Sequence, residues 1–268
     1  MAQNQDHENS LELIEGLKQQ LAQSERMAIL GELTSTTTHE FNNILTTIIN
    51  YAKLGLRHTD EQTRTKSLDK ILNAANRAAK ITSTILGMAK NRKTGFEPTQ
   101  LNVLIEDTLF LLEREMNKYR ISVEKTLNPN PEIYADGNKI QQVLINLLVN
   151  ARQAMPNGGR LVIKTDFDQE NQLVELTIRD FGTGISSDKL PRIFERFYST
   201  KESADESGKG GTGLGLSACR EIIEAHHGKV RVESKLGKGT AFIIKFPIFS
   251  PTVQTPPFIV TDNLVPSS

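Results

Sequence analysis

The chain has 268 residues, of which 32 are basic and 32 acidic, so its formal net charge is zero. This balance gives no bulk electrostatic reason to expect nucleic acid or an anionic membrane surface as a partner. Apolar content is 37% and charged content 24%, which is typical of a folded protein with one large or two small domains.

The sequence carries no recognisable membrane or export signal. No apolar run approaches the roughly 20 residues that a membrane span needs, and the start, MAQNQDHENS, is polar. A single cysteine, Cys219, excludes an internal disulfide framework and fits a reducing compartment. Its apolar helical surroundings predict a buried packing role. We therefore expect a cytoplasmic protein without a membrane span in this chain.

The first third of the chain is periodic in a way that predicts long helices. Residues 11–31 space their apolar and small side chains alternately by three and four, as in a short coiled coil. The stripe runs on through Phe41, Leu45 and Ile48 until the polar stretch RHTDEQT, and a further helix follows with Leu68 and Leu72 on its inward face. Two helices joined by a short polar turn predict an antiparallel hairpin. Because a lone hairpin encloses no core, we expect two copies to form a four-helix bundle.

A breaker-rich stretch, NRKTGFEPTQ, then marks a domain boundary. Beyond it, helices are predicted over 101–117, 137–155 and 214–227, and strands over 120–127, 132–136, 159–167, 172–180, 228–234 and 240–247. This order predicts an α+β sandwich with its helices on one face of a sheet. The tail 250–268 is rich in proline and serine, and we expect it to be disordered.

Asp180 stands at the end of a predicted strand, in RDFGTGI. Its carboxylate offers two acceptor oxygens, which suit an exocyclic amine such as that of adenine. Gly182 and Gly184 allow the backbone to turn and to approach a ligand closely. A plain turn at the end of a strand explains the same residues equally well.

A glycine-rich stretch, GKGGTGLGLS, leads into the last predicted helix. Free backbone N–H groups at a helix start bind anions, so its chemistry suits phosphate. It is neither a Walker loop, because GK[ST] is absent, nor a dinucleotide fingerprint, because no strand directly precedes it. A flexible linker is the alternative, but a linker would not continue into so regular an apolar helix.

Two amides, Asn146 and Asn150, lie one turn apart on the otherwise apolar helix QVLINLLVNARQAM. A Mg²⁺ ion with phosphate oxygens would satisfy them. Two amides that cap neighbouring backbone are an equally good interpretation.

The stretch TSTTTHEFNN places His39 beside Glu40, with Asn43 one turn later. Zinc binding by an HExxH motif is excluded because Asn43 occupies the second histidine position. A metal ligand, a general base, a nucleophile and a surface residue otherwise remain open for a lone histidine. We expect His7, His58, His226 and His227 to be solvated surface residues.

Five stretches, LINLLVNA, DFGTG, IFERFYSTK, GGTGLGLS and GKGTAF, together resemble the catalytic domain of sensor histidine kinases in order and spacing. That domain belongs to an ATPase superfamily shared with type II topoisomerases, mismatch-repair clamps and a heat-shock chaperone. HEFNN, further upstream, resembles the phospho-acceptor box of the same kinases. The resemblance covers roughly residues 27–247. It implies a helical-hairpin dimerisation domain, a four-helix bundle in the dimer, followed by an α+β ATP-binding sandwich.

The resemblance also implies a domain organisation. Residues 1–26 would be an N-terminal polar segment and coiled coil, 27–94 the dimerisation and histidine phosphotransfer domain, and 98–249 the catalytic ATP-binding domain. The coiled coil would connect to an upstream sensor or signalling partner, so the chain would suit a soluble part of a larger or membrane-associated sensor.

The phospho-acceptor likeness implies that His39 takes the γ-phosphoryl group of ATP, with Glu40 as general base. Helical phase agrees, because His39 lies off the apolar stripe and is therefore expected to be exposed. Asn43 would orient water for dephosphorylation of a partner regulator.

The catalytic-domain likeness implies that Asn150 and Asn146 hold Mg²⁺ and that Asp180 binds adenine. It also implies that Thr240 lies near the water that links Asp180 to adenine. Lys201 would compensate γ-phosphate charge, with Arg196 as the second candidate. The residues expected around the nucleotide are Asn146, Asn150, Asp180, Gly182, Gly184, Lys201, Gly211, Thr212, Gly213, Leu214, Gly215 and Thr240. Gln153 replaces a basic residue common in the family, and Ile44 a common proline.

Two functions follow from the resemblance. The first is a homodimeric, ATP- and Mg²⁺-dependent histidine kinase that phosphorylates His39 and then a receiver-domain aspartate of a response regulator, with dephosphorylation of that regulator as a second expected activity. The alternative is a nucleotide-gated dimer clamp of the same superfamily without kinase activity. The Glu40–Asn43 spacing favours the kinase.

Overall fold

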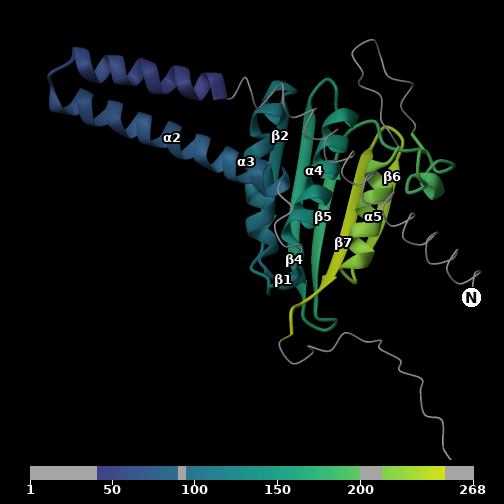
Figure 1. The fold of residues 1–268 in the computed structure, drawn as a ribbon. Helices are drawn as coiled ribbons and strands as arrows, with labels where there is room; N and C mark the ends of the chain where they lie inside the picture. The colour runs from purple at the N-terminus through teal and green to yellow at the C-terminus, as the bar shows by residue number, and fades with distance from the viewer. Residues whose placement is uncertain (1–40, 90–94, 200–212, 251–268) are drawn as a thin grey trace, which may run out of the picture.

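A computed structural model of the chain describes residues 41–89, 95–199 and 213–250 (Figure 1). A helix over 41–57 and helix α2 (Glu61–Ala89) form the expected hairpin. Helix α2 begins inside the stretch expected to be a turn, because Asp60 Oδ1 accepts the N–H of Thr63 at 2.7 Å as an N-cap. The expected coiled coil over 11–31 lies outside the described residues, as does the tail from 251.

Among the described residues, the hairpin buries a small apolar cluster. Ile44 packs with Ala74 and Ile81, each of them buried. Leu68 and Leu72, assigned above to the inward face, are 65% and 60% exposed in the single chain. Two helices in contact cover one stripe each, so the second apolar stripe of this hairpin stays open to solvent.

The rest of the described chain forms an α+β sandwich, which confirms the expected fold class. Its helices are α3 (Leu101–Lys118), α4 (Gly137–Ala154) and α5 (Gly215–Ala225), with a short 3₁₀ turn over Leu190–Arg192. The strands of the main sheet are β2 (Ile121–Leu127), β4 (Gly159–Asp168), β5 (Leu173–Asp180), β6 (Lys229–Lys235) and β7 (Gly239–Pro247). Their order is β2-β4-β5-β7-β6; β2 pairs in parallel with β4, and the remaining pairs are antiparallel.

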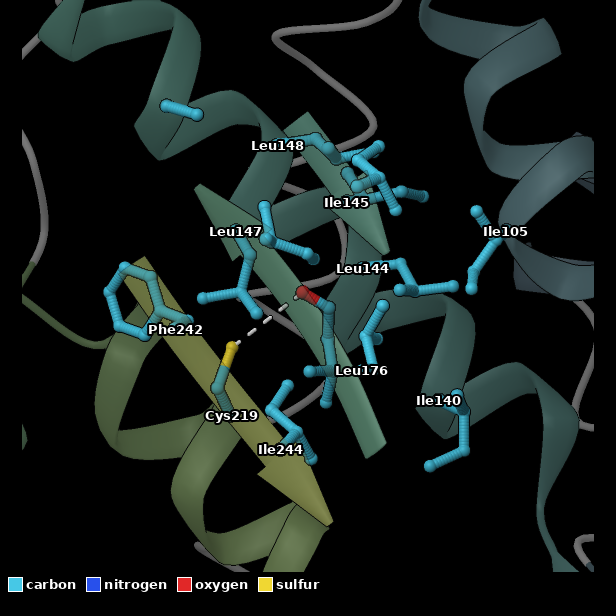
Figure 2. Packing of buried hydrophobic residues seen from close by; sticks show 14 of the residues in the cluster. Ile105, Ile140, Leu144, Ile145, Leu147, Leu148, Leu176, Cys219, Phe242 and Ile244 are labelled. Carbon is cyan, nitrogen blue, oxygen red and sulfur yellow. Dashed lines mark hydrogen bonds between the residues drawn. The ribbon is translucent and has the colours of Figure 1, made fainter. Parts of the chain in front are cut away.

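The core lies between the sheet and its helices. Alternate residues of β5, among them Leu176 and Ile178, point inward and are almost fully buried. They meet the apolar face of α4, where Leu144 is 1% exposed (Figure 2). Cys219 is also 1% exposed, and its Sγ lies 3.9 Å from the carbonyl oxygen of Val143, so the predicted packing role is confirmed.

A second, two-stranded sheet pairs β1 (Glu97–Thr99) with β3 (Ile133–Ala135). The strand β1 was not expected, because Pro98 and the nearby Gly95 are residues that usually interrupt strands and helices. Pro98 is tolerated here because the strand is three residues long and pairs on one side only within the described residues.

The hairpin contacts the sandwich through α2 and α3. Arg77 forms an ion pair with Glu113 at 2.9 Å, and Lys80 forms one with Asp107 at 2.8 Å. Both cations also lie over the ring of Phe110, whose centroid is 4.9 Å from the Arg77 guanidinium carbon and 4.8 Å from Lys80 Nζ. Figure 1 shows the hairpin extending from this side of the domain.

His226 is buried, so its prediction as a surface residue was wrong. It is 2% exposed, its Nδ1 lies 2.7 Å from the carbonyl oxygen of Ile222, and its Nε2 accepts the N–H of Asp136 at 3.0 Å. Asp136 in turn caps α4 through the N–H groups of Asn138 and Lys139. The histidine is therefore a neutral, fully used hydrogen-bonding group that joins the end of α5 to the start of α4.

This burial predicts a pH-dependent loss of stability. Desolvation lowers the pKa of His226 below its ordinary value, so the folded state binds the proton less readily than the unfolded state. Stability is then full above about pH 6.5 and falls as the pH drops below it. We expect the Tm of the protein to fall by roughly a few degrees when the pH is lowered from 7.5 to 5.5. His226→Gln should remove most of this pH dependence.

Thermal unfolding followed by circular dichroism at both pH values measures the effect. His58→Gln is the matched control, because the His58 side chain is 52% exposed and should leave the slope unchanged. An equal pH slope in His226→Gln and the parent protein would contradict the prediction.

Candidate functional site

Asp180 ends β5 as a buried carboxylate, 4% exposed. Its Oδ1 accepts two backbone N–H groups, from Gly182 at 2.9 Å and from Thr240 at 3.2 Å. Both bonds engage the same oxygen, which leaves Oδ2 available to accept from a ligand. Burial raises the pKa of Asp180, and the two N–H donors and Arg179 oppose that rise.

The loop after Asp180 lies directly against neighbouring backbone. A Cβ at Gly182 would come within 2.3 Å of the carbonyl oxygen of Ala154, at the end of α4, so only glycine fits. Gly184 lies against the carbonyl of Lys235, and the N–H of Thr183 donates to the Ala154 oxygen at 3.0 Å. The loop therefore holds Asp180 between the end of α4 and the end of β6.

The hydroxyl of Ser234 joins this loop to the turn between β6 and β7. Ser234 Oγ accepts the N–H of Ile185 at 2.8 Å and lies 2.9 Å from Thr240 Oγ1 and 3.0 Å from the Gly239 carbonyl oxygen. Sequence reasoning missed this residue. The available signal was the register of the final hairpin, in which Ser234 pairs with Thr240.

Asn146 faces α5 from α4. Its side chain is buried, and its Nδ2 donates to the carbonyl oxygen of Gly215 at 3.3 Å. The amide thus does bind neighbouring backbone, one of the two interpretations left open, while its side-chain oxygen keeps the chemistry of a metal ligand. Asn150 follows one turn later and is partly buried.

The donor set suits Mg²⁺ only in company with a phosphate. In the described parts of the chain, no group of three or more His, Cys, Asp or Glu side chains could hold a metal ion. Amide oxygens with phosphate oxygens and water are a set that Mg²⁺ accepts. The residues of α4 therefore fit a metal carried in by a nucleotide.

The segment before α5 packs closely against the backbone of Phe197. Gly213 has φ +69°, and a Cβ there would lie 2.5 Å from the carbonyl carbon of Phe197, whose N–H donates to the Gly213 oxygen at 3.0 Å. Leu214 precedes α5 as its N-cap residue, and Gly215 is the first residue of the helix. Arg196 forms an ion pair with Glu221 of α5 at 2.6 Å.

The structure thus brings together Asp180, Gly182, Gly184 and Thr240, and separately Asn146 and Gly215. Asn43 lies exposed on the helix over 41–57, on the hairpin rather than in the sandwich. Five of the expected site residues lie outside the described ranges: His39, Glu40, Lys201, Gly211 and Thr212.

Among the described residues, no helix is both long enough and apolar enough to cross a membrane.

Two protein families match the chain. Residues 135–249 match the family described as Histidine kinase-, DNA gyrase B-, and HSP90-like ATPase. Residues 29–94 match the His Kinase A (phospho-acceptor) domain. The first match contains Asp180 and α5, and the second contains the helix over 41–57.

Two relatives of the chain are kinases. The chain is 34% identical over 234 residues to sporulation kinase E of Bacillus subtilis, covering 87% of this chain and 30% of that protein. It is 34% identical over 232 residues to the signal transduction histidine-protein kinase AtoS of Escherichia coli, covering 86% of this chain and 37% of that protein. The chain therefore spans about a third of the length of these relatives.

Solved structures agree. The catalytic domain of histidine kinase ThkA is 33% identical to the chain with a TM-score of 0.50, and the match covers 57% of this chain and 97% of that domain. Two family matches in the expected order, relatives that are kinases and a catalytic domain matched over almost its whole length lead to one assignment. The chain belongs to the sensor histidine kinases of two-component systems.

Proposed function

We propose that this chain is an ATP-dependent protein-histidine kinase that phosphorylates His39 and passes the phosphoryl group to an aspartate in a response-regulator receiver domain. The observation that carries the proposal is the carboxylate of Asp180. It is buried, both of its N–H donors bind Oδ1, and it lies in the ATPase domain of a chain that also contains a phospho-acceptor domain.

In this proposal ATP binds with its base amine at Asp180 Oδ2 and its phosphates toward the start of α5. Asn150 and Asn146 would hold Mg²⁺, which would neutralise charge on the phosphate oxygens. Gly213 and Gly215, with Gly211, Thr212 and Leu214, would bind the phosphates through backbone N–H groups. Lys201 would bring the cation nearest the γ-phosphate, since Arg196 already forms an ion pair with Glu221.

Residues of the hairpin would accept the phosphoryl group and the proton that is released in the transfer. A ring nitrogen of His39 forms a bond to the γ-phosphorus, while the bond from that phosphorus to its bridging oxygen breaks and its electron pair leaves on ADP. The second ring nitrogen of His39 gives up its proton to Glu40, which acts as general base. Asn43 would orient water in the reverse, phosphatase direction at the regulator.

Two partners follow from the domain organisation. A second copy of the chain would cover the exposed apolar stripe of the hairpin, which includes Leu68 and Leu72. An upstream sensor or signalling partner would act through the coiled coil. We place these reactions in the cytoplasm, where ATP is supplied.

A labelling experiment tests the proposal. Incubation with γ-³²P-ATP and Mg²⁺ should yield protein-bound label that is lost in acid and stable in base, as expected for phosphohistidine. His39→Gln should reduce this label to background because it removes the imidazole that is proposed to accept the phosphoryl group. His58→Gln, at an exposed histidine of the same hairpin, should label normally. ATP hydrolysis without any label on the parent protein would rule out the kinase and leave a nucleotide-gated clamp.

A further inference from the structure

One hydroxyl has three hydrogen-bonding neighbours at the base of the nucleotide site. Ser234 Oγ lies 2.8 Å from the nitrogen of Ile185, 3.0 Å from the carbonyl oxygen of Gly239 and 2.9 Å from Thr240 Oγ1. Ser234 itself is partly buried, whereas Gly239 and Thr240 are buried. Its polar neighbours therefore depend on protein partners rather than on bulk water.

The protons in this group can be assigned by counting. A serine hydroxyl has one proton and two lone pairs. The Ile185 N–H occupies one lone pair, and a carbonyl oxygen can only accept, so the Ser234 proton must go to Gly239. The second lone pair then accepts the proton of Thr240 Oγ1. If Ser234 instead donated to Thr240, no proton would lie between Ser234 Oγ and the Gly239 carbonyl oxygen. These two oxygens would then repel each other at their separation of 3.0 Å.

This assignment determines what Thr240 offers to a ligand. With its own proton directed at Ser234, Thr240 Oγ1 carries only lone pairs on its remaining side. The same residue donates its backbone N–H to Asp180 Oδ1, so the Thr240 hydroxyl is tied to the residue that holds the carboxylate. The site then offers a base two hydrogen-bond acceptors, Asp180 Oδ2 and Thr240 Oγ1. Two acceptors attract an amine and repel a carbonyl oxygen.

We propose that Ser234 is a positioning residue that fixes Thr240 as a hydrogen-bond acceptor beside Asp180, and so selects nucleotides with an exocyclic amine over those with a carbonyl at the same position. The proposal rests on the proposed function, since it takes the site around Asp180 as the base-binding site. Ser234 does not touch the base in this proposal; it acts through the direction of one proton.

The test compares two nucleotides that differ at that position. ADP carries an amine on its base, and inosine diphosphate carries a carbonyl with a proton on the adjacent ring nitrogen. Equilibrium dissociation constants for both, measured by isothermal titration calorimetry on the whole chain, give a selectivity ratio that is independent of turnover. In Ser234→Ala the Thr240 proton is free to donate to the carbonyl. The ratio should therefore fall about fivefold to tenfold, the value of roughly one hydrogen bond.

Matched variants separate this role from a loss of fold. Ser234→Thr keeps a hydroxyl and should keep the parent ratio, and Ser122→Ala removes an exposed serine on β2 and should also keep it. Thr240→Val removes the acceptor itself and should lower the ratio by as much as Ser234→Ala. Ser234→Ala introduced into Thr240→Val should then cause no further fall, because the two changes act through the same hydroxyl.

Three results would overturn the proposal. One is an unchanged ratio in Ser234→Ala; another is an unchanged ratio in Thr240→Val, a result that does not require the serine variant to fold. The third is a further fall in the double variant, which would indicate general loosening of the hairpin. A parent protein that binds neither nucleotide would instead overturn the proposed function, and with it this role of Ser234.

Discussion

Asp180→Asn is expected to weaken adenine-nucleotide binding by about 100-fold, or about 3 kcal/mol. The amide oxygen of the new side chain must accept the N–H groups of Gly182 and Thr240, as Oδ1 does now. In the reverse orientation the NH₂ group of the asparagine would face these two N–H donors, and no hydrogen bond could form. The NH₂ group is then forced to point toward the ligand. A donor therefore faces the amine of the base where the carboxylate had offered an acceptor.

The same geometry predicts how binding depends on pH. A proton added to Asp180 would reside on Oδ2, since Oδ1 accepts two N–H groups, and it would turn the acceptor into a donor. Burial raises the pKa of Asp180, so this loss of affinity begins at a higher pH than for an exposed aspartate. Affinity of the parent protein should fall as the pH is lowered toward that raised pKa, and Asp180→Asn should lack this dependence.

Calorimetric titration with ADP at several pH values measures both effects. Asp188→Asn is the control, because Asp188 is an exposed aspartate of the same loop region and should bind ADP as the parent does. ADP affinity in Asp180→Asn within about threefold of the parent would show that this carboxylate does not read the base.

Leu72→Glu is expected to convert the proposed dimer into monomers and to raise its dissociation constant on the order of 1,000-fold or more. Leu72 is 60% exposed in the single chain and lies one turn after Leu68, which is 65% exposed. Burying such a side chain stabilises a contact by about 1.5–3 kcal/mol, and burying a carboxylate in its place costs more. In a two-fold symmetric dimer each substitution counts twice.

Sedimentation equilibrium gives the dissociation constant directly. Because Leu72 is exposed in the monomer, the variant should keep the circular dichroism spectrum of the parent. Leu236→Glu is the matched control, since Leu236 is 67% exposed but lies on the turn between β6 and β7, away from the hairpin. A Leu72→Glu protein that remains dimeric at the parent concentration would show that this stripe is not the dimer interface.

The position of Asp180 in the candidate site could be predicted because local chemistry sets the residues around it. Asp180 was predicted to end a strand with a glycine two residues later, and the structure shows why Gly182 is needed, since a Cβ there would collide with the carbonyl of Ala154. Ser234 could not be predicted in the same way. A serine on a strand is unremarkable until the hairpin register sets it opposite Thr240 and the Asp180 loop arrives 49 residues away in sequence.

The same distinction explains the errors. His226 looks like a polar residue at the end of a helix, and only the arrival of Asp136, 90 residues earlier in the chain, turns it into a buried acceptor. On the hairpin, periodicity gave a stripe that includes Leu45, yet Ile44 is the residue that the second helix covers, while Leu45 is 52% exposed. Periodicity locates an apolar face to within one position, and the contact between helices decides which row is buried.

The sequence by itself determined the helical hairpin, the α+β class of the sandwich, the family and the position of Asp180, because helix and strand periods and turn residues act over a few neighbouring positions. Tertiary structure alone decided that β2 runs parallel to β4, that His226 is buried and that the hydroxyls of Ser234 and Thr240 lie within hydrogen-bonding distance. These features depend on groups that lie far apart in the chain, and only packing of the whole core brings such groups within hydrogen-bonding distance.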